Sequence, residues 1–404
     1  MAVGPIPPEF GGRASGGIAM YLINLFSNFP RSAVKSCLFV ANSDMSLIDK
    51  DKLQMFEEVY SYQTRKIKLH KLLILNFLAA VKLAVRLRMN FFKLLFLPID
   101  YHEAISQCKP DVIFVMQIEY YALYTWLANK FGIPVAATIH SFNSVNTNDS
   151  RSNEKLARII RFNARHVNSL ISVSQSVLEE AQKNFAIIKN NNLIANGVDV
   201  DEFQPERKEA ACRRLNISSE KINMLFTGNL NVRKSVNVLI QAVAKLSRQQ
   251  HLLVLIVGDG EERHRLQTMA TDLNLSDVIK FMGGKRYDEM RDWYNACDIF
   301  VLPSKAEGLS LSLLEAMSCA RPVITTRPQF GSYDAIIDGE TGFLFEYGDV
   351  KQLTQKLKML IENQKLRKQI GENARRHISS QFTSQIMAEK TLQVLRKSAR
   401  MVKV

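Results

Sequence analysis

The chain has 404 residues, more than a single hydrophobic core usually organises, so two domains are expected. Hydrophobic residues make up 47% of the sequence and charged residues 23%, which is typical of a folded globular protein. The sequence has no low-complexity tract and no fixed-period repeat, which excludes extended disorder and a solenoid. The formal net charge of +14 requires a partner or a local cause.

The N-terminal segment MAVGPIPPEFGG has no basic region followed by a long apolar run, so we do not expect a secretory signal. The five cysteines are scattered and never spaced as CxxC, which indicates neither a disulfide framework nor a zinc site and favours a reducing compartment. Glycines cluster before the first expected helix. Glycine lets the backbone approach a phosphate closely, although glycine pairs before a helix are common and are a weak signal on their own. The glycines are Gly11, Gly12, Gly16 and Gly17.

A basic and apolar stretch follows, with no Asp or Glu from Val59 to Ile99. Its longest uncharged run, Leu72 to Val81, is far shorter than the roughly 20 residues that span a bilayer, so we expect no transmembrane helix. The open interpretations are a core helix with a solvated basic edge and docking on anionic lipid headgroups. We expect no nucleic-acid partner, because no binding signature accompanies the charge. The basic residues are Arg65, Lys66, Lys68, Lys71, Lys82, Arg86, Arg88 and Lys93.

Short apolar runs alternate with helical patterns through both halves of the chain, which predicts parallel sheets covered on both faces. We therefore expect an α/β protein with two doubly wound domains, joined by the polar stretch 196–209. The final helical pattern, 386–402, is long enough to pack back on the first domain. The expected strands are 36–41, 111–116, 134–140, 169–174, 222–228, 252–258, 278–283, 298–304, 322–326 and 342–345.

Polar residues stand directly after several of these expected strands. Ligands of open parallel sheets bind beyond the carboxyl ends of the strands, so the joint placement of these residues indicates a ligand site. They are His140, Arg233, Lys234, Asp259, Gly260 and Glu307.

Ordered motifs cover nearly the whole chain: GPIPPEFGG, IHSF, SVSQSVLE, NGVDVDEF, TGNLNVRKSV, VGDGEERHRL, DIFVLPSKAEGLSLSLLEAM and IIDGETGFLF. In this order they resemble the retaining glycosyltransferases of family 4, whose E-x7-E signature is matched by Glu307 and Glu315. The resemblance implies the GT-B fold, in which two Rossmann-like domains face each other across a cleft. Residues 1–196, with a C-terminal helix at about 385–404, would bind the acceptor, and residues 197–384 would bind the nucleotide sugar.

The resemblance also implies roles for the acidic pair. Glu307 would bond hydroxyls of the donor sugar, and Glu315, expected in the first turn of a helix that begins near 310–312, would accept both ribose hydroxyls. A solvated loop carboxylate is the alternative for Glu307, and a capping box with Ser312 is the alternative for Glu315. His140 would help to hold the reacting sugar.

Arg233 and Lys234 would face the diphosphate, which gains negative charge as the bond from sugar to phosphate breaks. The chain departs from the family pattern here, because Asn229 replaces the usual Arg and Ser235 replaces Gly; Arg233 would supply the missing charge. Neither a metal nor a cofactor is expected, since the D-x-D of Asp199 and Asp201 belongs to the NGVDVDEF motif. The remaining donor-binding residues are expected to be Gly12, Gly17, Gly228, Gly258, Asp259, Gly308, Leu309, Ser310 and Leu311.

The implied activity is transfer of a hexosyl unit from a nucleoside diphosphate sugar, UDP-linked by frequency, to an acceptor hydroxyl with the anomeric configuration kept. The alternatives are a sugar-phosphate synthase or phosphorylase of the same fold, a non-catalytic relative that binds nucleotide or glycan, and a basic scaffold that binds membrane or nucleic acid. The stretch near 65–97 motivates a lipid-linked or envelope glycan acceptor and a cytoplasmic protein that contacts the inner face of the membrane. The sequence indicates neither the donor sugar, the acceptor, the linkage nor the oligomeric state.

Overall fold

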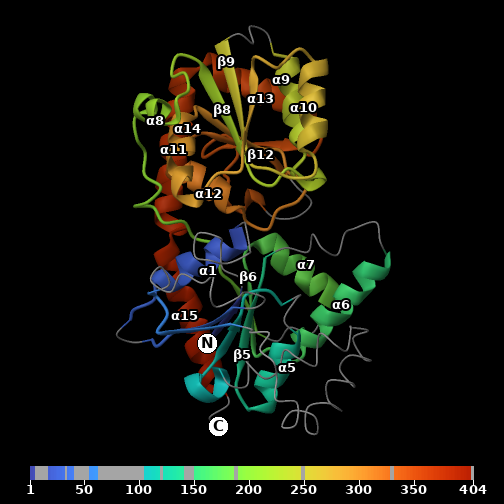
Figure 1. The fold of residues 1–404 in the computed structure, drawn as a ribbon, viewed down its shortest axis with the longest axis vertical. Coiled ribbons are helices and arrows are strands. Elements are labelled where there is room, and N and C mark those ends of the chain that lie inside the picture. The colour runs from blue at the N-terminus through green and yellow to red at the C-terminus, as the bar shows by residue number, and fades with distance from the viewer. Residues whose placement is uncertain are drawn as a thin grey trace. The chain divides into compact units, whose positions relative to one another are not determined.

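The computed structural model describes residues 1–4, 17–31, 34–40, 54–61, 104–118, 122–140, 150–185, 190–246, 251–327 and 332–401. The chain divides into two compact units (Figure 1): unit 1 is Met1–Ala195 with Met387–Val404, and unit 2 is Asn196–Ile386. The boundaries expected after residues 196 and 384 therefore fall after Ala195 and Ile386. Gly12 and the basic stretch near 65–97 lie outside the described residues.

The described residues of unit 1 form a seven-stranded sheet in the order β3-β2-β1-β4-β5-β6-β7, and every pair among these strands is parallel. Strands β4, β5 and β6 are short and buried along their length, as expected of a sheet covered on both faces. The strands are β1 (Ala2–Gly4), β2 (Cys37–Val40), β3 (Glu58–Ser61), β4 (Ile113–Val115), β5 (Val135–Ile139), β6 (Ser169–Ser172) and β7 (Asn191–Leu193).

The helices of unit 1 cover both faces of this sheet, with α5, α6 and α7 on one face and α1 on the other (Figure 1). The C-terminal helix α15 (Ser384–Arg400) begins in unit 2, and from Met387 onward it belongs to unit 1, where the Ser398 hydroxyl bonds that of Ser169 at 2.8 Å. The other helices are α1 (Gly17–Ser27), α5 (Ala122–Lys130), α6 (Ser150–Ala164) and α7 (Gln175–Phe185).

Unit 2 contains a six-stranded parallel sheet in the order β10-β9-β8-β11-β12-β13. Strands β8 and β11 are neighbours although they are not consecutive, so the direction of winding reverses between them and opens a crevice at their carboxyl ends. The strands are β8 (Ile222–Thr227), β9 (Leu252–Val257), β10 (Ile279–Gly283), β11 (Ile299–Leu302), β12 (Val323–Arg327) and β13 (Phe343–Glu346).

Two helices of unit 2 begin at side-chain N-caps that the sequence encodes locally. Asp349 and Asn363 cap α13 and α14 by accepting from the backbone N–H groups of Gln352 and Leu366, each at 2.9 Å. None of the described helices is long and apolar enough to cross a membrane. The helices are α8 (Lys208–Leu215), α9 (Val236–Ala244), α10 (Arg263–Asp272), α11 (Met290–Ala296), α12 (Leu311–Ser318), α13 (Val350–Glu362) and α14 (Gln364–Gln381), with the 3₁₀ turns η4 (Val232–Lys234), η6 (Tyr287–Glu289) and η7 (Ser332–Ala335).

The NGVDVDEF motif fixes the start of unit 2 by backbone contacts. A Cβ at Gly197 would lie 2.4 Å from the Thr383 carbonyl oxygen, so only glycine permits this approach. The Arg375 guanidinium donates to the carbonyl of Val200 at 2.8 Å and to that of Phe203 at 3.0 Å. The carboxylate of Asp199 accepts from the N–H groups of Asp201 and Glu202, each at 3.0 Å, which is a local turn contact.

Two details expected for the helix after β11 are wrong. The helix begins at Leu311, within the expected range 310–312, so Glu315 is its fifth residue and lies in the second turn rather than the first. The capping box is also absent: Ser310 is the N-cap, and the Ser312 hydroxyl bonds the Ser310 hydroxyl at 2.9 Å. The carboxylate of Glu315 makes tertiary contacts instead.

Candidate active site

The loops after β8 and β11 are fastened to each other at the reversal point of the unit 2 sheet. The Lys305 N–H donates to the Arg233 carbonyl at 2.8 Å, and the Arg233 guanidinium donates to the Ala306 carbonyl at 2.8 Å. These two bonds hold the basic residues after β8 against the acidic loop after β11. The strand ends at Leu302, so the loop that carries Glu307 runs from Pro303 to Ser310.

Glu307 lies between two cations, both of which the sequence had indicated as candidate site residues. Its carboxylate is 2.7 Å from Lys234 Nζ and 2.9 Å from an Arg233 guanidinium nitrogen. Glu307 and Lys234 are each 8% exposed, whereas a third of the Arg233 side chain faces solvent. The alternative of a solvated loop carboxylate is therefore wrong for Glu307.

Burial and charge act in opposite directions on this cluster. Burial by itself would raise the pKa of Glu307, but the adjacent Lys234 and Arg233 outweigh it and lower the pKa to about 2. Burial also disfavours the charged form of Lys234 and therefore lowers its pKa, and the adjacent Glu307 counteracts that effect. The cluster is thus a buried carboxylate kept ionised by its cations.

Lys234 is placed by a short turn with an unusual residue after it. In η4 the Asn231 side chain accepts from the Lys234 N–H at 3.1 Å, and Ser235 then adopts a left-handed conformation with φ of +50°. Such a conformation favours glycine, but the Ser235 hydroxyl bonds the Val232 carbonyl at 3.1 Å and helps to hold it. The Ser in place of the expected Gly is accommodated in this way.

The start of α12 leaves backbone donors without a side-chain cap. Ser310 makes no capping bond, and the first N–H groups of a helix have no partner within the helix. Asn196 donates to the Leu309 carbonyl at 2.6 Å and fixes the loop just before this helix start. Gly308, Leu309, Ser310 and Leu311 are all buried here, and the arrangement suits an anion.

Glu315 is 4% exposed, and each of its carboxylate oxygens has a tyrosine partner. Tyr294 donates to Oε2 at 2.7 Å and Tyr287 donates to Oε1 at 3.2 Å. Burial raises the pKa of Glu315 to about 7, and the two tyrosine hydroxyls lower it from what burial alone would produce. The sequence did not predict either tyrosine, and no spacing rule links them to a glutamate that follows β11.

The predicted glycines of unit 2 have packing roles. A Cβ at Gly258 would lie 1.9 Å from the Gly228 carbonyl oxygen, and Gly228 itself lies against Lys234 with φ of +144°. Asp259 is more than half exposed and pairs with Arg263 at 2.7 Å, so it does not reach the Glu307 cluster through any described contact. These glycines bring the ends of β8 and β9 together behind Lys234.

In unit 1, His140 follows β5 and is 7% exposed. Its Nε2 is 3.0 Å from the Thr138 hydroxyl, and its ring meets that of Tyr21 edge-on with centroids 4.7 Å apart. Burial lowers the pKa of His140 to about 4, so the imidazole is neutral at physiological pH. Gly17, expected just before the first helix, is the first residue of α1.

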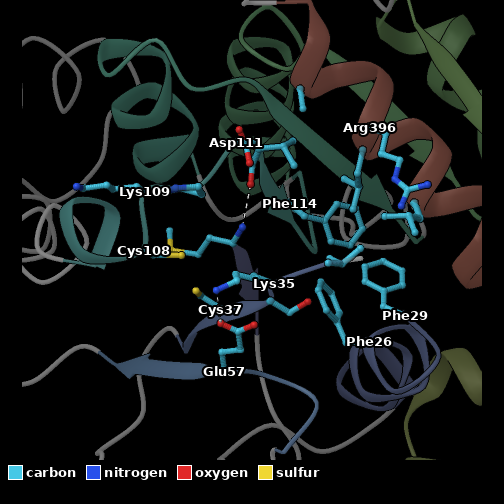
Figure 2. A pocket seen from close by; sticks show the side chains of 18 of the residues that line it. Phe26, Phe29, Lys35, Cys37, Glu57, Cys108, Lys109, Asp111, Phe114 and Arg396 are labelled. Atoms are coloured by element: carbon cyan, nitrogen blue, oxygen red, sulfur yellow. Dashed lines mark hydrogen bonds and ion pairs between the residues drawn. The ribbon is translucent and has the colours of Figure 1, made fainter. Parts of the chain in front are cut away.

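A cavity of about 720 Å³ in unit 1 contains none of the predicted site residues (Figure 2). It lies near the amino ends of β1, β2 and β4, between residues such as Phe26, Cys37, Asp111 and Arg396. Ligands of parallel sheets bind at the carboxyl ends, so this cavity is not the predicted site. Among the described residues, no group of three His, Cys, Asp or Glu side chains is placed to hold a metal ion.

Two family models match the chain: "Glycosyltransferase Family 4" over residues 15–202 and "Glycosyl transferases group 1" over residues 207–377. The D-inositol 3-phosphate glycosyltransferase of Corynebacterium jeikeium is 30% identical over 289 residues, which are 65% of this chain and 68% of that one. The capsular polysaccharide biosynthesis glycosyltransferase CapM of Staphylococcus aureus is 28% identical over 196 residues, 48% of this chain and 51% of that one.

Among solved structures, that of Anabaena HepE in complex with UDP covers 98% of both chains, with a TM-score of 0.75 and 18% identity. This likeness concerns the fold, and it confirms the expected GT-B architecture of two parallel-sheet α/β domains. The sequence matches carry the activity class. The chain is a hexosyltransferase that belongs to glycosyltransferase family 4.

Proposed function

We propose that the protein transfers a hexosyl unit from a UDP-sugar to a glycan hydroxyl, with the anomeric configuration kept and without a metal ion. The observation that carries this proposal is the buried cluster of Glu307, Lys234 and Arg233 beside the uncapped start of α12. It places positive charge and free N–H groups at the edge of the sheet where a nucleotide would bind.

The diphosphate binds at the start of α12 in this proposal, with its leaving oxygen facing Lys234 and Arg233. Negative charge grows on the diphosphate as the bond to the sugar breaks, and buried cations stabilise that charge more strongly than water does. A pair of fixed cations then does the work for which other enzymes use a divalent ion. Addition of a chelator is expected to leave the rate unchanged.

Glu307 accepts from hydroxyls of the donor sugar, and Glu315 accepts from the ribose hydroxyls. A carboxylate with a pKa of about 2 stays ionised at every physiological pH, so Glu307 is a constant acceptor. His140 of unit 1 is a neutral hydrogen-bonding group, which suits a hydroxyl rather than a phosphate. None of these groups is assigned as a covalent nucleophile, so attack on the same face, assisted by the departing phosphate oxygen, is proposed.

The acceptor is proposed to be an envelope or exopolysaccharide glycan that is presented at a membrane surface. CapM, a relative by sequence, is named for capsular polysaccharide biosynthesis, and the chain carries a formal charge of +14 that would favour an anionic surface. Flotation with liposomes that contain anionic lipid, at low and at high salt, tests this part. Absence of binding at low salt would remove the membrane from the proposal.

The donor is identified by screening nucleotide sugars for a rise in the unfolding temperature, because a ligand that binds only the native state stabilises it. Each stabilising compound is then incubated with the protein, and release of nucleoside diphosphate is measured with and without candidate acceptors. Proton NMR of the product gives the anomeric configuration. Consumption of glycogen with phosphate, or of a hexose phosphate acceptor, would instead support a phosphorylase or a synthase.

A further inference from the structure

Three separate elements of unit 2 meet at the carboxylate of Glu315. Tyr287 comes from η6 and Tyr294 from α11, and both donate to a glutamate of α12 from opposite oxygens, at 3.2 and 2.7 Å. A family signature accounts for the glutamate. It does not account for two hydroxyls that converge on it.

Aromatic packing fixes both tyrosine rings in place. Tyr294 is 1% exposed and makes edge contacts with Phe203 and Phe300, with centroids 5.9 and 5.8 Å apart. Phe203 also meets Tyr287 edge-on at 5.6 Å, so one phenylalanine supports both tyrosines. The hydroxyls therefore cannot turn away without disturbing a packed core.

A third hydroxyl extends the arrangement away from the carboxylate. Thr227, the last residue of β8, lies 3.3 Å from the Tyr294 hydroxyl. Since the Tyr294 proton points to Glu315, the threonine proton points to Tyr294, and donors arranged in series polarise one another. The chain of hydroxyls thus ends at the carboxylate and strengthens its negative form.

We infer that Tyr287 and Tyr294 are positioning residues that orient the Glu315 carboxylate and favour its ionised form for a vicinal diol. A carboxylate has about four lone-pair sites, and one tyrosine on each oxygen leaves one site on each oxygen. Two hydroxyls on adjacent carbons match those two remaining sites. The choice of the ribose as that diol depends on the proposed function, whereas the effect of the tyrosines on the carboxylate does not.

The electrostatic surroundings agree with this role. Burial holds the pKa of Glu315 near 7, and the tyrosine hydroxyls are the groups that lower it. Loss of either hydroxyl would raise the pKa of Glu315 further, so a smaller fraction of the carboxyl could accept from both hydroxyls of a diol at neutral pH. The other titratable or charged groups that act on this site or on its neighbours, within the described part of unit 2, are Asp199, Glu202, Asp288, Arg291, Cys319, Arg321 and Arg375.

A ligand-free titration tests the inference directly. The wild type and each tyrosine variant are compared with the same protein that also carries Glu315→Gln. The infrared difference spectra isolate the band of the protonated Glu315 carboxyl as the pH is varied. We expect the midpoint to move upward by on the order of one pH unit in Tyr294→Phe and by less in Tyr287→Phe, because each loses one charge-assisted hydrogen bond. Thr227→Val should move it slightly in the same direction.

Tyr347→Phe is the matched control, since that hydroxyl bonds Ser235 and not Glu315. Its midpoint should equal that of the wild type. Tyr294 is buried, so Tyr294→Phe could disturb folding; Tyr287 is partly exposed and provides the second variant. If the midpoint stays at the wild-type value in both folded tyrosine variants, the inference is overturned.

A binding measurement then identifies the diol. The terminal phosphate of UDP also changes charge near neutral pH, so the quantity to follow is the ratio of the Kd of 2′,3′-dideoxy-UDP to the Kd of UDP. This ratio should rise with pH through the Glu315 midpoint, and at higher pH in the tyrosine variants. A ratio of one at every pH in the wild type would reject the ribose role proposed for Glu315, while the infrared midpoints would still decide the role of the tyrosines.

Discussion

The two units share one winding pattern but place different chemistry at the carboxyl ends of their strands. Both sheets have the order 3-2-1-4-5-6 when their strands are counted along the chain, with one further strand in unit 1. Unit 2 carries a buried carboxylate and a buried lysine at its reversal point, whereas unit 1 carries a buried neutral imidazole after β5. The topology therefore fixes where a ligand binds, and the local side chains decide its charge.

This difference has an energetic reason. Buried charges lose their hydration, and a buried ion pair seldom stabilises a protein more than packed hydrophobic residues would. The cluster of Glu307, Lys234 and Arg233 is therefore poorly explained by a contribution to folding stability and well explained by the binding of a charged ligand. The neutral site of unit 1 suits an uncharged sugar or acceptor hydroxyl.

The largest expected effect is that of Lys234→Ala. It removes a buried cation from the proposed diphosphate site, so the transfer rate should fall by about 10³-fold, since fixed charges of this kind contribute roughly 3 to 4 kcal/mol. The Kd of UDP should rise with it. Steady-state kinetics measure the rate, and Lys358→Ala, an exposed lysine of α13, should match the wild type. A similar loss in both variants would show that overall charge, rather than the cluster, matters.

Glu315→Gln should stabilise the free protein at alkaline pH. The folded-state pKa of Glu315 is raised to about 7, so its contribution to stability is present below its unfolded value and is lost as the pH rises through 7. Glutamine never ionises, and its advantage should approach about 3 kcal/mol at pH 8.5 and vanish near pH 4.5.

The measurement is denaturant unfolding of unit 2 followed by Trp293 fluorescence in a Trp126→Phe background, because each unit contains one of the two tryptophans. The same variant should bind UDP more weakly than the wild type. If the variant and the wild type were equally stable at both pH values, the raised pKa of Glu315 would be contradicted.

Glu307→Gln separates sugar binding from phosphate binding. We expect the transfer rate to fall by about 10²-fold, or ~2.7 kcal/mol, while UDP binds as well as or better than in the wild type. UDP gains because Lys234 and Arg233 lose their own anion and remain available to the diphosphate. Calorimetry with UDP and kinetics with the full donor give the two quantities. A parallel loss of both would mean that Glu307 only holds the cations in place.

The sequence predicted the frame of both units well, because buried parallel strands appear as short continuous apolar runs. Residues 252–258 were expected as a strand, and β9 spans Leu252–Val257. The sequence also assigned Lys234 and Glu307 to one ligand site, because both follow strands that are neighbours in this winding, but it did not predict the ion pair between them. The short strands β1, β3 and β7 were missed, because none of them has a strong apolar run.

The environment of Glu315 was predicted wrongly for a physical reason. The local pattern Ser312-x-x-Glu315 fits a capping box, but the N-cap is Ser310, two residues earlier, and the carboxylate faces Tyr287 and Tyr294. Tertiary hydrogen bonds replaced the local one. A tyrosine from a different element leaves no spacing signal in a single sequence, so its role required coordinates.

His140→Gln should have the smallest effect and should show that unit 1 works without charge. The transfer rate should fall by about tenfold through the loss of one hydrogen bond to a neutral group, and the ratio to the wild type should stay constant from pH 6 to pH 8.5.

The folded-state pKa of His140 is lowered to about 4, so its contribution to stability is present above its unfolded value near 6.5 and is lost as the pH falls through 4. Glutamine removes that titration, and unit 1 of the variant, followed by Trp126 fluorescence in a Trp293→Phe background, should lose less stability between pH 6.5 and pH 4. A ratio that changes around neutral pH would require a charged imidazole. Unit 1 would then not differ from unit 2 in having an uncharged site.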